Sequence, residues 1–63
     1  MILNLKLARI KKGLTQEALA AKVGITRTIY SNIERGKTEP TRDIMKKLSE
    51  TLDTPIIDLF FSE

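Results

Sequence analysis

The feature that most constrains this 63-residue chain is a segment from Leu14 to Lys37, LTQEALAAKVGITRTIYSNIERGK. Apolar residues recur at helical spacing on both sides of Gly24, a residue type that readily ends a helix in the left-handed conformation. Thr15 and Thr26 stand where the two helices would begin, and a second glycine follows the later one. The segment therefore predicts two short helices joined by a tight turn.

The rest of the sequence is helical too. Helical spacing runs from Leu5 to Gly13, and Thr41 and Thr54 mark the starts of two later helices. Pro55 follows Thr54, as a proline at the first helical position would. No run alternates with the period of two that marks a strand. We therefore expect one all-α domain over residues 1–63, a compact bundle of five helices.

Composition excludes several classes of function. The chain contains no cysteine and no histidine, so it lacks a thiol nucleophile, the commonest general base and the usual zinc ligands. We expect no enzyme activity, no cofactor, no metal and no small-molecule ligand. No apolar run approaches the roughly 20 residues that span a membrane, and the start lacks a signal-peptide pattern. We therefore expect a cytoplasmic protein with no membrane partner.

Charge is distributed unevenly along the chain. All 11 basic residues lie between Lys6 and Lys47, together with four acidic ones, which gives +7. Residues 48–63 hold the other four acidic residues and no basic one, which gives −4 and restores the net charge of +3. This asymmetry favours one face for a polyanion such as nucleic acid. A solvated surface with uneven charge explains it equally well.

Five short motifs stand at a characteristic joint spacing. They are Leu14-Thr15-Gln16, Leu19-Ala20, Val23-Gly24-Ile25, Ile33-Glu34-Arg35-Gly36-Lys37 and Pro40-Thr41. Over roughly Leu5 to Leu59, the chain resembles the phage Cro and repressor class of helix-turn-helix transcription regulators. The resemblance implies the lambda-repressor-like five-helix fold, with the helix-turn-helix formed by helices 2 and 3. It also implies sequence-specific binding to double-stranded operator DNA, usually by a homodimer.

The resemblance makes the third helix the recognition helix. By position in the motif, Arg27, Thr28 and Asn32 match the sites that face the bases, with Ser31 a second choice. Arginine can bond bidentately to guanine, asparagine to adenine, and threonine can touch a thymine methyl. Solvated polar side chains are the alternative interpretation. Ile29 departs from the small or polar residue common at its position, and either meets thymine methyls or only covers the helix edge.

Phosphate contacts are implied on both sides of that helix. Gln16 resembles a clamp that contacts phosphate and supports the recognition helix, with an exposed helix-start glutamine as the alternative. Arg35, Lys37 and Arg42 surround the end of the third helix and the start of the fourth. The backbone amides of Thr41 and its neighbours are further candidates. A solvated loop is the alternative for Lys37.

Two further expectations concern the interior. The resemblance implies a structural salt bridge between Arg9 in the first helix and Glu34 near the end of the third. Tyr30 occupies a position that is normally aliphatic and faces the core. We expect its ring to pack inward while its hydroxyl reaches solvent or phosphate.

The C-terminal helix, about residues 55–61, carries more large apolar side chains than so short a helix can bury. We expect Ile56, Leu59 and Phe60 to turn inward and a two-fold dimer to cover the apolar surface that remains, with a frayed terminus as the alternative. Such a dimer places two recognition helices about 34 Å apart, one turn of DNA. The sequence thus favours a dimeric repressor at a palindromic operator, against an antitoxin or other protein-interaction module. The expected interface residues are Ile56, Ile57, Phe60 and Phe61.

Overall fold

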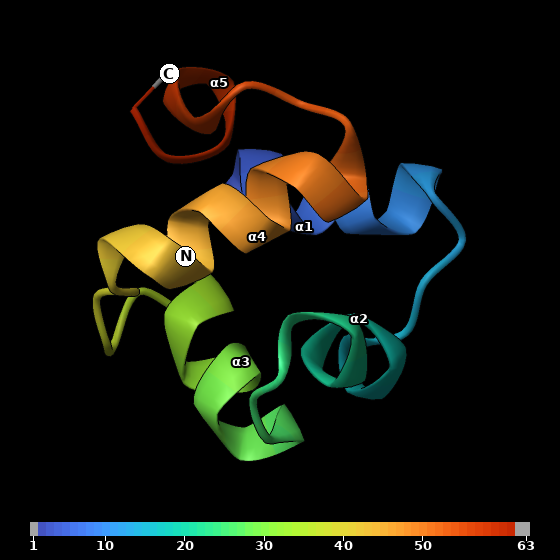
Figure 1. The fold of residues 1–63 in the computed structure, drawn as a ribbon, viewed down its shortest axis with the longest axis vertical. Helices are drawn as coiled ribbons and strands as arrows, with labels where there is room; N and C mark the ends of the chain where they lie inside the picture. The colour runs from blue at the N-terminus through green and yellow to red at the C-terminus, as the bar shows by residue number, and fades with distance from the viewer. Residues whose placement is uncertain (1, 62–63) are drawn as a thin grey trace.

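The computed structural model describes residues 2–61 and folds them into five helices with no strand, which confirms the expected all-α class. Figure 1 shows α5 at one end of the molecule, α2 and α3 at the other, and α4 across the middle in front of α1. None of these helices is long and apolar enough to cross a membrane. Their bounds are α1 Leu3–Lys11, α2 Gln16–Val23, α3 Arg27–Glu34, α4 Arg42–Leu52 and α5 Ile56–Phe60.

All five helices contribute to one hydrophobic core. The buried side chains are mainly leucines, each of which stabilises the fold by about 1.5–3 kcal/mol when fully buried. Tyr30 is the largest buried side chain and is 0% exposed. The core residues are Leu5, Leu19, Ala20, Val23, Tyr30, Ile33, Leu48, Leu52 and Leu59.

The turn at Gly24 sets α3 against α2. Gly24 lies in the left-handed region with φ 79°, and the next amide, that of Ile25, donates to the carbonyl of Ala20 at 3.0 Å. A Cβ atom built at Gly24 would meet nothing within 4 Å. The backbone conformation, and not a lack of space, is therefore the reason for glycine here.

Three of the four expected threonine caps are confirmed. The hydroxyls of Thr15, Thr26 and Thr41 accept hydrogen bonds from the amides three residues later, at 3.0, 3.1 and 3.2 Å. Each bond satisfies an amide that the first helical turn leaves without a carbonyl partner. These caps fix where α2, α3 and α4 begin.

The fourth expected cap, Thr54, is wrong. Its hydroxyl donates back to the carbonyl of Leu52 at 2.9 Å, because the end of α4 offers carbonyls that have no helical partner. Pro55 is the N-cap residue of α5 instead of its first residue, and its carbonyl accepts from the amides of Asp58 and Leu59. No side chain caps α5.

The end of α4 contains an unusual backbone conformation. Asp53 has φ 53° and ψ 42°, in the left-handed region, and is the sole residue other than glycine with positive φ in the described part of the chain. Its amide donates to the carbonyl of Glu50, and the amide of Thr54 donates to that of Ser49. Asp53 thus occupies a position at which glycine is the favoured residue.

Candidate nucleic-acid interface

Helix α3 has two distinct faces. Tyr30, Ile33 and Glu34 are buried against the other helices. The residues expected to read bases, Arg27, Thr28, Ser31 and Asn32, fall on another face of the helix, at spacings of one, four and five residues from Arg27. Arg27 and Thr28 are exposed there, whereas Ser31 and Asn32 are half-buried.

Ile29 of α3 is exposed as well, with 47% of its area accessible. Its amide is held by the Thr26 cap, which ties it to the first turn of α3. The position that departs from the family pattern is thus accessible and contributes nothing to the core. An apolar side chain therefore stands among the polar ones at the start of α3.

Beneath this surface lies a buried carboxylate. Glu34 is 4% exposed, and Arg9 of α1 bonds both of its oxygens, with Nε to Oε2 at 3.0 Å and Nη2 to Oε1 at 3.3 Å. The remaining Arg9 nitrogen donates to the carbonyl of Leu14 at 2.8 Å. The guanidinium therefore joins α1, the turn before α2 and the end of α3 in a bidentate ion pair.

Two more donors reach the same carboxylate. Gln16 Nε2 donates to Glu34 Oε1 at 3.2 Å, and the Tyr30 hydroxyl donates to Oε2 at 2.5 Å. Our expectation that this hydroxyl reaches solvent or phosphate is wrong. The Glu34 carboxylate lies one helical turn away, at i and i+4 spacing, and offers a charged acceptor inside the protein.

These contacts shift three pKa values. Burial raises the pKa of Tyr30, and the hydrogen bond to Glu34 and that residue's negative charge raise it further. For Glu34, burial favours the neutral acid, but hydrogen bonds from Arg9, Tyr30 and Gln16 outweigh it and leave its pKa below the usual value. The hydrogen bond to Glu34 raises the pKa of Arg9 against the opposing effect of burial. The charged Arg9–Glu34 pair and the neutral phenol are thus the favoured states.

The sequence-predicted phosphate residues fall into two sets that flank α3. Gln16 lies half-buried at the start of α2. Arg35, Lys37 and Arg42 are exposed around the loop that joins α3 to α4, on the other side of α3 in Figure 1. The amide of Lys37 donates to the carbonyl of Asn32 at 2.9 Å, which holds the loop against the end of α3. The two sets can therefore bracket whatever α3 contacts.

At the start of α4, Thr41 is exposed, and its hydroxyl is occupied as the helix cap. The contact proposed for this residue involves its backbone amide and those of its neighbours. The cap bond uses the amide of Ile44, three residues further on. A helix start of this kind directs amides and the positive end of the helix dipole outward.

A shallow hollow of about 360 Å³ separates the starts of α2 and α3. It brings Gln16 to the same depression as Arg27, so a clamp candidate and a reading candidate share one surface. The exposed Glu17, to which the sequence analysis gives no role, also lines this hollow. The Tyr30–Glu34 bond was missed as well, although the spacing of the two residues on one helix was a usable signal.

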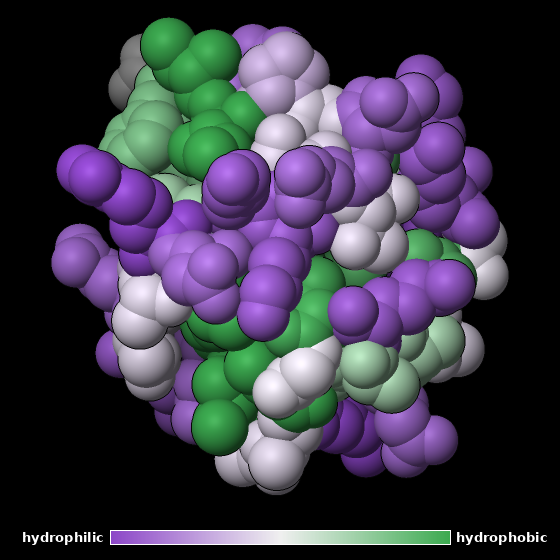
Figure 2. All heavy atoms as spheres, viewed as in Figure 1, coloured by the Kyte–Doolittle hydropathy of each residue, from purple (hydrophilic) through white to green (hydrophobic). Residues whose placement is uncertain are grey.

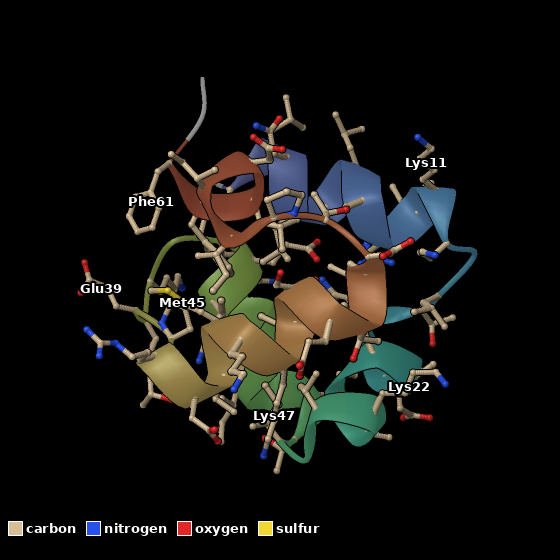
Figure 3. All side chains as sticks on the ribbon, turned by 45° about the horizontal axis from the view of Figure 1, so that its top comes forward. Lys11, Lys22, Glu39, Met45, Lys47 and Phe61 are labelled. Carbon is tan, nitrogen blue, oxygen red and sulfur yellow. The ribbon has the colours of Figure 1, made fainter. Side chains whose placement is uncertain are left out.

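Helix α5 exposes part of its apolar surface. Leu59 is buried as expected, and Ile56 and Phe60 are half-buried, whereas Ile57 is 62% exposed and Phe61 is 66% exposed. Figure 2 shows apolar surface gathered over α5, and Figure 3 shows Phe61 at the edge of the molecule. The expected interface residues therefore differ in how much surface they offer.

Sequence reasoning missed a second apolar surface, on α1. Leu3, Leu7 and Ile10 are 55%, 52% and 53% exposed. Their spacing of four and three residues places them on one face of the helix. That spacing was visible in the sequence and marks an apolar face, but it does not distinguish a buried face from an exposed one.

The sequence of this chain is similar to those of known proteins. The profile of a family described as helix-turn-helix, HTH_3, matches residues 5–59. The chain is 37% identical over 60 residues to the HTH-type transcriptional regulator SlrR of Bacillus subtilis, covering 94% of this chain and 40% of that protein. It is similar to the uncharacterised HTH-type transcriptional regulator MJ0272 of Methanocaldococcus jannaschii, with 37% identity over 95% of this chain and 91% of the relative.

A third relative is the control protein C.MunI of a Mycoplasma species, with 38% identity over 87% of this chain and 74% of the relative. The chain thus spans less than half of SlrR but most of the other two relatives. The family match covers most of the sequence. The chain belongs to the helix-turn-helix family of DNA-binding transcriptional regulators, which is not a family of enzymes.

Proposed function

We propose that this protein is a dimeric repressor that binds a palindromic operator in double-stranded DNA. It acts in the cytoplasm of a prokaryotic cell. Its gene belongs to that cell or to a phage or mobile element. The observation that carries the proposal is the division of α3 into a buried face and an outward polar face. Family membership supports the DNA partner. No cofactor or small-molecule ligand is needed for this function.

The proposed reading residues are Arg27, Thr28 and Asn32, with Ser31 beside them. None of these four is among the buried residues of α3, which hold the helix against the rest of the protein. A good bidentate contact from Arg27 or Asn32 contributes about 1–3 kcal/mol of discrimination between bases. The exposed Ile29 adds an apolar group suited to a thymine methyl.

Phosphate contacts would fix the register of α3 in the major groove. We assign them to Gln16 on one side, and to Arg35, Lys37, Arg42 and the Thr41 amide on the other. These residues position the protein without reading sequence. Their placement on both sides of α3 supports the assignment, because phosphates line both edges of a groove.

The proposed dimer forms through α5. Exposed Ile57 and Phe61 provide the centre of an apolar contact, and half-buried Ile56 and Phe60 extend it. In Figure 1, α5 lies at the opposite end of the molecule from the N-terminal end of α3. Dimerisation and DNA binding would therefore use different surfaces. A two-fold dimer reads two half-sites about 34 Å apart.

Selection of bound duplexes from a random DNA pool tests the proposal. We expect a palindromic site with half-sites about one helical turn apart. Arg27→Ala should lose about 1–3 kcal/mol at the selected site and relax preference at one base pair. Arg42→Ala should weaken binding to all sequences alike and reduce the slope of log affinity against log salt by about one.

Identical behaviour of the two variants at selected and random DNA would contradict the assignment of reading and phosphate residues. Recovery of no preferred sequence would contradict sequence-specific binding itself. Enrichment of a site without two-fold symmetry would contradict the symmetric dimer.

The exposed apolar end of α5 also favours a second candidate function. Ile57 and Phe61 could cover a different protein, as they would in an antitoxin or another interaction module of the same fold. Sedimentation of the purified chain distinguishes the two, because a regulator of the proposed kind dimerises alone. A chain that stays monomeric until the product of a neighbouring gene is added would favour the second candidate.

A further inference from the structure

We infer that Tyr30 is a positioning residue for DNA binding. Through Glu34 it fixes the orientation in which Gln16 of α2 presents its carboxamide beside the reading face of α3. This inference rests on the proposed function, since it concerns how one of the proposed phosphate contacts is held. The Tyr30 side chain is fully buried and its hydroxyl bonds Glu34, so its effect on DNA binding passes through that carboxylate.

The argument starts from the donors around Glu34. Its Oε2 receives the Tyr30 hydroxyl at 2.5 Å and Arg9 Nε at 3.0 Å. Its Oε1 receives Gln16 Nε2 at 3.2 Å and Arg9 Nη2 at 3.3 Å. A carboxylate has about four lone-pair sites, so these four bonds satisfy it.

The second step concerns the polarity of the Gln16 side chain. A carboxylate oxygen can only accept, so the group that faces Glu34 must be the amide nitrogen and not the amide oxygen. The bond therefore leaves the Gln16 oxygen and the second N–H of its nitrogen for the outer surface. Without this bond, the Gln16 carboxamide could rotate by half a turn and exchange the positions of its oxygen and its nitrogen.

The third step identifies the particular role of Tyr30. Arg9 reaches Glu34 from α1 and Gln16 reaches it from α2, whereas Tyr30 lies on α3 one turn before Glu34. Tyr30 therefore fixes the Glu34 carboxylate relative to the helix that carries the reading face. The carboxylate in turn fixes the position of the Gln16 carboxamide relative to that helix.

A double-mutant cycle tests the inference, with a duplex selected from the random pool as the probe. Tyr30→Phe removes the hydroxyl and keeps the ring in the core. We expect it to weaken binding about fivefold when Gln16 is present, and less than about twofold in the Gln16→Ala background. Equal losses in the two backgrounds would overturn the inference, because a merely structural role acts whether or not Gln16 is there.

Ile44→Val is the matched control. It removes one methyl group from a half-buried side chain of α4 that takes part in none of the four bonds to Glu34. All variants are compared at a temperature at which circular dichroism shows them folded. We expect the effect of Ile44→Val on binding to be the same with and without Gln16.

A second readout needs no DNA. Gln16 is the single glutamine in the sequence, so its side-chain amide gives one pair of signals in a proton–nitrogen correlation spectrum, and the loss of that pair in Gln16→Ala distinguishes it from the pairs of Asn4 and Asn32. We expect Tyr30→Phe to move this pair and Ile44→Val to leave it in place. An unmoved pair in Tyr30→Phe would overturn the positioning role. If the wild-type protein bound no duplex, the proposed function would fail, while this spectrum would still decide how Gln16 is held.

Discussion

Glu34 is a negative charge enclosed by donors from three helices. Its lowered pKa means that the folded protein stabilises the ionised carboxylate relative to the neutral acid more than the unfolded chain does. The stability it contributes is therefore present above the ordinary glutamate pKa of about 4.3, and is lost as pH falls through the lower folded value. At neutral pH the ion pair is fully formed.

Tyr30 gives a prediction at the alkaline end. Its pKa is raised, so the stability it contributes is present below the unfolded tyrosine value of about 10 and is lost as pH rises above it. Because Tyr30 is the one tyrosine and the chain has no tryptophan, tyrosinate absorbance reports on it alone. We expect this absorbance and the loss of helical circular dichroism to rise together with pH.

Tyr30→Phe provides the control, because its circular dichroism shows what the lysines alone do at high pH. Appearance of tyrosinate while the helices remain intact would contradict the buried hydrogen bond to Glu34.

Arg9 gives a second prediction at this scale. Arg9→Met removes both bonds to Glu34 and leaves a buried charge with less compensation, which should cost about 3–5 kcal/mol of unfolding free energy. DNA affinity should fall only as a consequence. Lys11→Met, an exposed position on the same helix, should change stability by no more than about 0.5 kcal/mol. Denaturant unfolding measures both, and an unchanged Arg9→Met stability with lost DNA binding would show that Arg9 acts on DNA.

The sequence predicted part of this cluster and missed the rest for a physical reason. The pair of Arg9 and Glu34 followed from the resemblance, and burial of the Tyr30 ring followed from its position in the motif. The direction of the hydroxyl did not, because it depends on the exact place of a charged acceptor inside the core. Gln16 was expected to support the recognition helix. Its bond to Glu34 could not be predicted, because it depends on how α1, α2 and α3 pack around that carboxylate.

At the scale of elements, the end of α4 offers a test of backbone strain. Asp53→Gly should stabilise the fold by about 1 kcal/mol, because glycine adopts the left-handed conformation without the steric cost of a Cβ. Asp53→Ala is the control, since it removes the same charge and keeps the Cβ, and it should not stabilise. Thermal unfolding measures both variants, and equal stabilisation by the two would show that charge, not conformation, is the cause.

Helix boundaries were largely predictable because their signals are local. A threonine hydroxyl reaches an amide three residues later wherever the chain turns into a helix, as at Thr15, Thr26 and Thr41. Thr54 failed because two helix ends lie close together there. Its hydroxyl could serve the last carbonyls of α4 or the first amides of α5, and the sequence does not say which.

At the scale of the whole molecule, two apolar surfaces are candidates for association, and a pair of substitutions separates them. Ile57→Glu should convert the proposed dimer to a monomer, because it places a charge in the centre of the α5 contact. Leu7→Glu, at a similarly exposed apolar position on α1, should leave the dimer intact. Sedimentation over a range of concentrations measures both. Dissociation by Leu7→Glu alone would move the interface to α1.

The exposed face of α1 shows what periodicity cannot supply. Leu3, Leu7 and Ile10 recur at the spacing of an amphipathic helix, yet Leu5 is the α1 residue that enters the core. Which face of α1 turns inward depends on how α3 and α5 meet it, and those contacts join residues far apart in sequence. The arrangement of the five helices therefore came from the resemblance and not from the hydrophobic pattern.

The separation of the two faces of α3 has a consequence for how such a protein could change its target. Substitutions at Arg27 and Thr28 fall on exposed positions and should disturb folding little, whereas those at Tyr30 or Glu34 disturb a closed set of bonds. Under the proposed function, single substitutions on the outward face can therefore change which operator is bound, whereas the buried residues can change only together. Descendants of one chain could then diverge in the genes they control and keep the same interior.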